Sequence, residues 1–361
     1  MTSQKGLALV LVLWVLSLLT IMAGSFALSM RREASITSGI KNNAQALAVA
    51  QSGIALAEMM LLLPDKTKTW RTDGSIYQIT GTDTQVRVRL FSESGKIDIN
   101  KADEKLLKAL FSQAPTDNES LKISKHDIDP VAAILDWRDS DDLIHLNGAE
   151  KKQYMEAGLN YSPRNKPLQS IEELQLILGM NEDLINWLEP LITLYSGQAK
   201  ANLQFASREL LNVMPNLDAE LIEQYLKLRR DTAVQGLPAP PFPTNGQIIM
   251  PSESDKQKAA TSQENADETQ DKTANSNDEN GENTGLAEPV SVGAVTIIAE
   301  AVLVDGSSAV IKALVKSADG TTNSPFAVIA WQRDTDLEKS LFDDTMDDLV
   351  INDYGEPELN N

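Results

Sequence analysis

The sequence predicts an α+β protein in which a long N-terminal helix packs on an antiparallel sheet, with a large all-helical segment inserted into that sheet. Three observations lead to this prediction. An uncharged apolar run opens the chain, and two groups of segments alternate apolar and polar residues. Between these groups, apolar residues recur every three or four positions, as they do in helices.

The apolar run extends from Leu7 to Met30 without a charged residue. As a helix it would span roughly 36 Å, enough to cross a hydrocarbon layer of about 30 Å. The run is longer than the apolar core of a signal peptide, and Arg31 and Arg32 follow it directly, which favours a lasting anchor. Apolar residues then continue at helical spacing to Leu61, so we expect one helix from Leu7 to Leu62, half membrane span and half amphipathic stem.

The alternating segments predict strands. Residues 75–80 and 85–91 form a predicted β-hairpin across Gly81-Thr82-Asp83. Residues 295–304, 309–315 and 326–331 are three further predicted strands, separated by turn signals. Trp137, Trp187 and Trp331 lie within apolar patterns and are expected in the core.

The region between the strand groups contains three related helix starts, at residues 97–107, 167–174 and 201–211. Each places a polar capping residue before an acidic first turn and an apolar stripe, as helix N-termini require. In the second start, Ser170 and Glu173 fit a capping box.

Composition excludes several classes of function. The 361 residues include 52 acidic and 32 basic side chains, for a net charge of −20, which argues against a protein that grips phosphates or anionic lipid. With no cysteine, disulfides, zinc–thiolate sites and cysteine nucleophiles are impossible. Only His126 and His145 offer an imidazole, and neither lies near a nucleophile motif, so we expect no enzyme.

The acidic excess is concentrated in two segments. Residues 253–288 are polar, acidic and without aromatic side chains, so they cannot offset the entropy of ordering by burial and are predicted to be a disordered loop. Residues 343–361 are predicted to be a mobile acidic tail. The remaining body is only mildly acidic.

Four acids invite a calcium interpretation because Ca²⁺ prefers oxygen ligands. They are Asp139, Asp141, Asp142 and Glu150. Leu143 and Ile144 occupy positions where an EF-hand loop needs an oxygen ligand and a glycine, so this is not an EF-hand. The alternative is that the acids cap helices and pair with Arg138.

The N-terminal sequence Lys5-Gly6-Leu7-Ala8-Leu9 and the apolar helix after it resemble the leader of type IV pilins and type II secretion pseudopilins. Most of those proteins carry Glu at the fifth mature position, where this chain has Leu11, a departure typical of the minor pseudopilin K family. The helix starts, which resemble helix-hairpin-helix units, and the acidic segment 136–142 strengthen this resemblance over residues 1–236 and 295–331.

The resemblance implies a pilin-like fold and a place at the tip of a periplasmic pseudopilus in protein secretion. It implies a single-pass inner-membrane protein with a periplasmic body, cut by prepilin peptidase after Gly6 and methylated on Leu7. The implied partners are the minor pseudopilins I, J and H and the inner-membrane secretion platform, with no nucleic acid. It also implies calcium binding, either at the four acids or at Asp334 and Asp336 after the last strand.

These expectations divide the chain into a leader (1–6), a transmembrane helix (7–30), a stem helix (31–63) and the first part of the sheet (64–99). A helical insertion domain (100–236), an acidic loop (237–292), the second part of the sheet (293–335) and an acidic tail (336–361) follow.

Two other classes of function remain open. Helix-hairpin-helix units often bind DNA, so a membrane-anchored DNA-uptake protein is one alternative, although the hairpins at residues 112–115, 178–181 and 214–217 lack the Gly-x-Gly turn that offers amides to phosphates. The other is a membrane-tethered enzyme, for which the sequence supplies no catalytic constellation.

Overall fold

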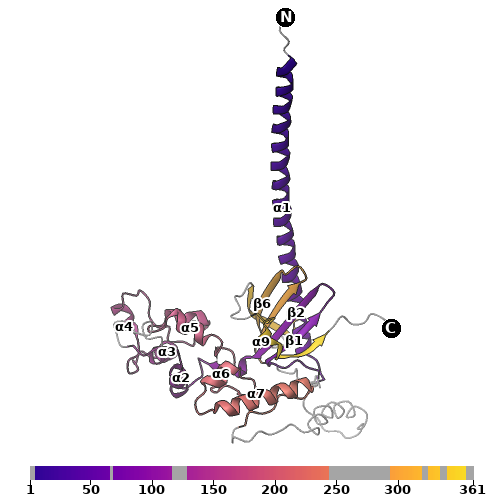
Figure 1. Ribbon diagram of the computed structural model, residues 1–361. Coiled ribbons are helices and arrows are strands. Elements are labelled where there is room, and N and C mark those ends of the chain that lie inside the picture. Colours follow the sequence, from indigo (N-terminus) through magenta and orange to yellow (C-terminus); the bar gives the residue numbers. More distant parts are fainter. Residues whose placement is uncertain are drawn as a thin grey trace, which may run out of the picture.

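The computed structural model describes residues 5–65, 68–115, 128–243, 293–318, 324–333 and 340–354. Its most prominent element is helix α1 (Lys5–Leu61), whose N-terminal half projects far from the rest of the molecule (Figure 1). The C-terminal end of α1 lies against a six-stranded sheet, and a group of short helices lies beside that sheet (Figure 1).

Helix α1 confirms the helix expected from Leu7 to Leu62, and it runs unbroken because no proline occurs before Pro64. Two hydroxyls in its apolar half, those of Ser17 and Thr20, donate to carbonyl oxygens four residues earlier, at 2.9 and 2.8 Å. These polar groups are therefore satisfied within the helix, as a lipid environment requires.

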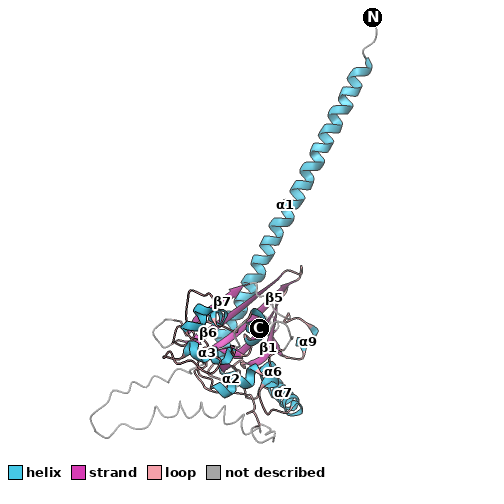
Figure 2. Ribbon diagram, turned by 90° about the vertical axis from the view of Figure 1, so that its left-hand side faces the viewer, coloured by secondary structure: helices cyan, strands magenta, loops and turns pink. Residues whose placement is uncertain are grey.

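The two halves of α1 have different surroundings. The large apolar side chains from Leu9 to Met30 are exposed, whereas a stripe in the second half is buried: Ala46, Ala50, Ile54, Ala57 and Leu61. That stripe packs on β2 (Thr84–Ser92), β5 (Val295–Leu303) and β6 (Ser308–Ser317). Figure 2 shows the C-terminal end of α1 meeting the sheet. Gly53 allows this close approach, because a Cβ there would lie 2.9 Å from a methyl carbon of Val86.

The sheet has the strand order β7-β6-β5-β2-β1-β8. Its strands are β1 (Asp73–Thr80), β2 (Thr84–Ser92), β5 (Val295–Leu303), β6 (Ser308–Ser317), β7 (Phe326–Arg333) and β8 (Val350–Tyr354). The predicted hairpin and the three later strands are confirmed, and all of these neighbours pair antiparallel. Strand β8 pairs parallel with β1, which the sequence did not predict.

The expected mobile tail was wrong for its described part. Residues 340–354 fold back on the sheet through helix α9 (Asp344–Asp347) and β8. The buried carboxylate of Glu300 on β5 accepts bonds from the Ser340 hydroxyl at 2.7 Å and from the Leu341 N–H at 2.5 Å. Arg87 on β2 donates to the Leu341 carbonyl and pairs with Asp347, so charges in the strands hold this acidic segment.

The expectation that Trp331 belongs to the core was also wrong, since its side chain is 37% exposed on the edge strand β7. The contacts of α1 are concentrated on β2, β5 and β6, so little covers β7. Trp137 is buried as expected, and Trp187 is partly buried.

The segment between β2 and β5 forms a second part of the body, here called the head (residues 93–243). Its two 3₁₀ helices are η1 (Glu93–Gly95) and η2 (Ile171–Leu176). Its α-helices are α2 (Glu104–Phe111), α3 (Pro130–Arg138), α4 (Lys151–Glu156), α5 (Glu182–Leu188), α6 (Arg208–Val213) and α7 (Ala219–Val234). The head is not purely helical, because β3 (Ile97–Asp98) and β4 (Ile192–Thr193) pair in parallel. It has a hydrophobic core separate from the core under α1.

A helix begins at each of the three predicted starts: α2, the 3₁₀ helix η2 and α6. The Asp103 carboxylate accepts from the Leu106 N–H at 2.7 Å at the start of α2, and the Ser207 hydroxyl accepts from the Leu210 N–H at α6. The capping box at Ser170 was wrong: its side chain makes no capping bond at η2. Glu173 accepts instead from the Gln169 N–H, Arg164 and Trp137, because stronger donors lie within its reach.

Several predictions fall outside the described residues. They are the leader residues Met1 to Gln4, His126, the acidic loop from residue 244 to 292, Asp334, Asp336, and the tail after Tyr354.

Candidate functional site

The strongest candidate site lies around the end of α3 and combines three acids with a histidine and an asparagine. We call it the acid cluster: Asp136, Asp139, His145, Glu150 and Asn165. Asp136 is fully buried. One of its oxygens accepts from the backbone and ring N–H of His145, at 3.0 and 2.5 Å, and the other accepts from the Ala149 N–H at 2.7 Å. These bonds wrap the loop after α3 around one carboxylate.

Gly148 makes this wrapping possible. A Cβ at that position would lie 2.0 Å from an oxygen of Asp136, so any other residue would displace the carboxylate. The oxygens of Asp136 and Asp139 and a ring nitrogen of His145 consequently lie within 4.8 Å of one another. Three potential metal-binding groups thus converge at the end of one helix.

Three buried oxygens of the acid cluster make no hydrogen bond within the described structure: Asp139 Oδ1, Glu150 Oε1 and Asn165 Oδ1. Glu150 is only 7% exposed. Asn165 Nδ2 donates to the Asp141 carbonyl and the Asp142 carboxylate, both at 2.8 Å, which fixes its amide and identifies Oδ1 as the unbonded atom. Buried oxygens without donors are costly, and a cation would satisfy them.

The raised pKa values of two acids in the cluster also indicate that a bound cation would stabilise it. Burial raises the pKa of Glu150 to about 7, and repulsion from Asp136, Asp139 and Asp142 adds to this effect. Burial also raises the pKa of Asp139, with further repulsion from Asp141 and Asp136. Like charges are held together here, a strain that a bound cation would relieve.

The structure therefore brings together two of the four predicted ligands, Asp139 and Glu150. Asp141 accepts from the Leu143 N–H at 2.9 Å, and Asp142 binds Asn165, so both act in shaping the loop. The predicted contact of these acids with Arg138 is not among the described ion pairs; Arg138 donates instead to the Ile99 and Ala102 carbonyls.

Sequence reasoning missed Asp136, His145 and Asn165 as members of the site. Asp136 carried a signal, since it is an acid in the otherwise apolar face of a buried helix. Asn165 carried none, because only the tertiary fold brings it to the loop.

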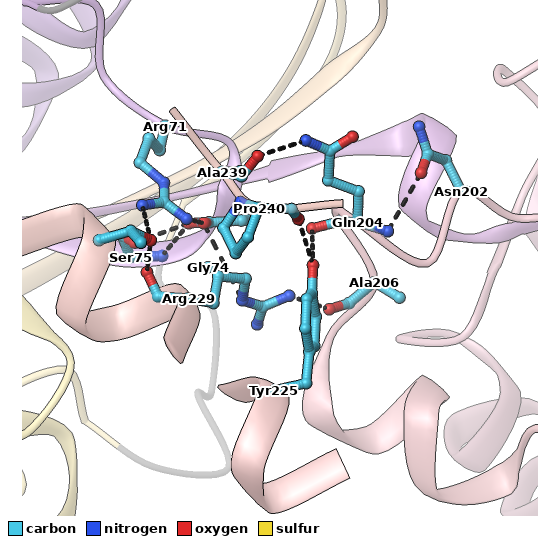
Figure 3. Close-up of polar contacts among 12 residues, drawn as sticks. Arg71, Gly74, Ser75, Asn202, Gln204, Ala206, Tyr225, Arg229, Ala239 and Pro240 are labelled. Carbon is cyan, nitrogen blue, oxygen red and sulfur yellow. Dashed lines mark hydrogen bonds and ion pairs between the residues drawn. The ribbon is translucent and has the colours of Figure 1, made fainter. Parts of the chain in front are cut away.

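A second polar feature joins the head to the sheet, and we call it the arginine joint: Arg71, Asp73 and Arg229 (Figure 3). Asp73 on β1 is 1% exposed and forms ion pairs with Arg71 and with Arg229 of α7. Burial is the largest influence on the Asp73 pKa and acts to raise it, but the two arginines and Ser75 outweigh it and hold the pKa below its ordinary value.

Hydrogen bonds around the arginine joint extend the connection (Figure 3). Arg229 donates to the Ala206 carbonyl at 2.7 Å, and the buried Tyr225 hydroxyl donates to the Pro240 carbonyl at 2.9 Å. Arg71 donates to the Thr232 hydroxyl at 3.2 Å. The Arg71–Thr232 bond and the ion pair of Arg229 with Asp73 therefore hold the head to the sheet, whereas the bonds of Arg229 to Ala206 and of Tyr225 to Pro240 lie within the head.

The third functional feature is the N-terminal half of α1. Among the described residues, α1 is the one helix that is long and apolar enough to cross a membrane, as judged by length and composition. Because its side chains are exposed while the second half packs on the sheet, α1 fits a single-pass anchor for the body.

Part of the head is similar to a known protein family. Residues 90–197 match the family described as type II secretion system (T2SS), protein K. The type II secretion system protein K of Klebsiella pneumoniae is 29% identical over 205 residues, or 52% of this chain, and the chain spans 62% of that relative's length.

Among solved structures, a chain of the GspK-GspI-GspJ complex from the type 2 secretion system of enterotoxigenic Escherichia coli is similar, at 15% identity and a TM-score of 0.46. The match covers 83% of this chain and 99% of that chain. The family match, which includes the whole acid cluster, and the Klebsiella relative agree with the resemblance found in the sequence: residues 90–197 are similar to the type II secretion system protein K family.

Proposed function

We propose that the chain is a minor pseudopilin of a type II secretion system, which caps the tip of the periplasmic pseudopilus and helps to initiate its assembly. One observation carries this proposal: a protein K domain is inserted between β2 and β5 of a sheet that sits on a long apolar helix. The apolar half of α1 would pack beside equivalent helices of other subunits. The head projects sideways from α1 (Figure 1), a bulk that fits at the end of a narrow fibre.

The location follows from α1. Its exposed apolar half would span the inner membrane once, leaving the sheet and head in the periplasm. Prepilin peptidase would cut after Gly6 and methylate Leu7, and the described helix begins at Lys5, next to that junction. In pilins the acid missing at Leu11 is thought to pair with the N-terminal amine of a neighbour. Its absence therefore supports a first, terminal subunit.

Mass spectrometry of the full chain purified from a host with prepilin peptidase tests the processing. We expect a mature N-terminus at Leu7 carrying one added methyl group, and the uncut chain from a host without the peptidase as the control. An N-terminus at Met1 in both hosts, or a cut far beyond Gly6, would contradict the proposal.

The proposed partners are the minor pseudopilins I and J, with H next to them, and the inner-membrane platform. Co-expression of the full chain with the I and J proteins should give a complex that survives purification in detergent. Gold particles directed at this chain should then label one end of each assembled fibre. Label distributed along the fibre would exclude a tip position.

We also propose that the acid cluster binds Ca²⁺. Asp139, Glu150 and Asn165 would supply the oxygens that lack hydrogen bonds, and Asp136 would hold the loop in place around them. Bound there, the ion would neutralise repelling carboxylates and fix the loop between α3 and α4. The other candidates, Asp334 and Asp336, remain a prediction outside the described residues.

Calorimetric titration of the full chain, stripped with a chelator and kept in detergent, tests this site. We expect saturable binding of Ca²⁺ and at least tenfold weaker binding in Glu150→Gln, a loss of about 1.4 kcal/mol. Glu156→Gln is the matched control, because Glu156 is the last residue of the helix that Glu150 caps and pairs with exposed Lys152. Equal Ca²⁺ affinity in both variants would show that the ion binds outside the acid cluster. Absence of any heat of binding in the wild type would reject the calcium proposal.

A further inference from the structure

A cavity of about 410 Å³ lies beside the arginine joint, where strands β1 and β2, helices α6 and α7, and the C-terminal segment α9–β8 meet. It is distinct from the acid cluster and belongs to no part of the proposed assembly. Its basic lining residues are Arg89, Arg208, Lys227, Arg229 and Arg230. Its volume is within the range of small-ligand sites in proteins.

Most of the charges in this cavity are already paired. Of the four acids that line it, Asp73 pairs with Arg229 and Arg71, Glu223 with Arg208, and Asp348 with Arg230. The fourth acid, Glu209, and the remaining lysine, Lys227, are both exposed, so their charges are screened by water. Arg89 is left as the basic group inside the cavity that has no ion pair within the described structure.

The guanidinium of Arg89 is held in place by uncharged groups and forms no ion pair within the described structure. Its Nε donates to the Gly74 carbonyl at 3.0 Å, its Nη1 approaches the sulfur of Met346 at 3.9 Å, and its Cζ lies 4.6 Å from the centre of the Phe91 ring. None of these partners carries a negative charge. Burial lowers the pKa of Arg89; the charges of Glu209 and Asp73 act to raise it, and the charge of Arg229 acts to lower it.

A guanidinium without an ion pair at the wall of a cavity is costly, because it has lost much of its water and the carboxylates of Glu209 and Asp73 act on it without forming an ion pair. Its planar set of N–H donors matches a carboxylate, which it binds through two parallel hydrogen bonds. We infer that this cavity binds a carboxylate-bearing ligand through Arg89. The carboxylate belongs either to a small free acid or to an acidic side chain of a protein segment.

Calorimetric titration of the full chain in detergent, at low salt and pH 7.5, tests the inference with two probes of equal charge. One is succinate, and the other is a capped Glu-Glu dipeptide. We expect saturable binding of at least one probe with a Kd below about 1 mM. Tighter binding of succinate identifies a small acid as the ligand, and tighter binding of the dipeptide identifies an acidic protein segment.

Arg89→Gln should weaken the binding at least tenfold. Arg333→Gln is the matched control, since Arg333 is an exposed arginine of the same sheet, at the end of edge strand β7, and does not line the cavity. Its variant should bind like the wild type. If Arg89→Gln does not fold, Arg89→Lys keeps the charge but lacks the two-donor plane and should also bind more weakly. No saturable binding of either probe, or unchanged affinity in the Arg89 variant that folds, would overturn the inference.

Discussion

The arginine joint and the acid cluster both contain buried charged groups, but the net charge is positive at the joint and negative in the cluster. At the joint, one carboxylate faces two guanidiniums, and the pKa of Asp73 is held below its ordinary value. In the acid cluster, several carboxylates repel one another, and burial with this repulsion raises the pKa of Glu150 to about 7. Both places contain buried polar atoms without a hydrogen bond in the described structure, including Arg71 Nε and Asp73 Oδ2 at the joint. The comparison teaches that the charges of the joint pair with one another, whereas the carboxylates of the cluster repel one another and would be relieved by a cation.

The largest effect should come from breaking the joint. Asp73→Ala leaves Arg71 and Arg229 without their shared counter-ion, although both side chains are only 11% exposed. Removing one partner of a buried ion pair costs about 3–5 kcal/mol, which chemical unfolding of the full chain would measure. Glu104→Gln is the control: its pair with Lys108 is exposed and should cost less than about 1 kcal/mol. Similar losses of unfolding free energy in both variants would show that the buried ion pairs of the joint contribute no more than an exposed pair.

A smaller effect should follow from removing calcium. Because the ion would bind the folded acid cluster, Ca²⁺ at one hundred times its Kd should stabilise the chain by about 2.7 kcal/mol, and a chelator should reverse this. Thermal unfolding would measure the change. Without calcium, Glu150→Gln should be no less stable than the wild type, since it removes a repelled charge. A clear loss of stability in that variant would argue that the Glu150 carboxylate acts in the fold and not in metal binding.

The smallest effect should be the pH dependence of the same site. With no cation bound, the Glu150 pKa of about 7 lies above its ordinary value of 4.5, so the folded chain holds a proton that the unfolded chain releases. This stability is present below the ordinary value and is lost as the pH rises through 7. Calcium must displace that proton, so its affinity should fall about tenfold between pH 7.5 and 6. Calorimetry at both pH values measures it, and a constant affinity would contradict the raised pKa.

Much of the fold could be predicted because its signals are local. The helix from Leu7 to Leu62 and the alternating strands depend on side-chain periodicity and on the positions of proline and glycine. Strand β8 escaped prediction because what holds it lies far away in the sequence: Glu300 and Arg87 anchor the segment before it. The prediction that Trp331 belongs to the core was wrong because an alternation of apolar residues does not show whether a strand lies at the edge of a sheet.

The candidate sites were less predictable for the same reason. Asp139 and Glu150 lie in one continuous acidic segment, and their residue types suggested calcium directly. Asn165 reaches the acid cluster only through the tertiary fold, and Asp73 meets Arg229 only when α7 returns to β1. No local pattern marks such contacts. The cavity beside the arginine joint likewise depends on three segments that are distant in the chain.

The insertion of the head within the sheet has a consequence for how the chain folds during synthesis. Strand β2 ends at Ser92, and its partner β5 does not begin until Val295, so the whole head is made while the sheet is still a lone hairpin. A lone hairpin is marginally stable in water, whereas the head has its own core. The head therefore folds first, and the sheet that supports it closes last, through pairings of long sequence separation that form slowly. Until then, both edges of the hairpin stay open to other chains, and the interval before β5 arrives is when this protein is most exposed to misassembly.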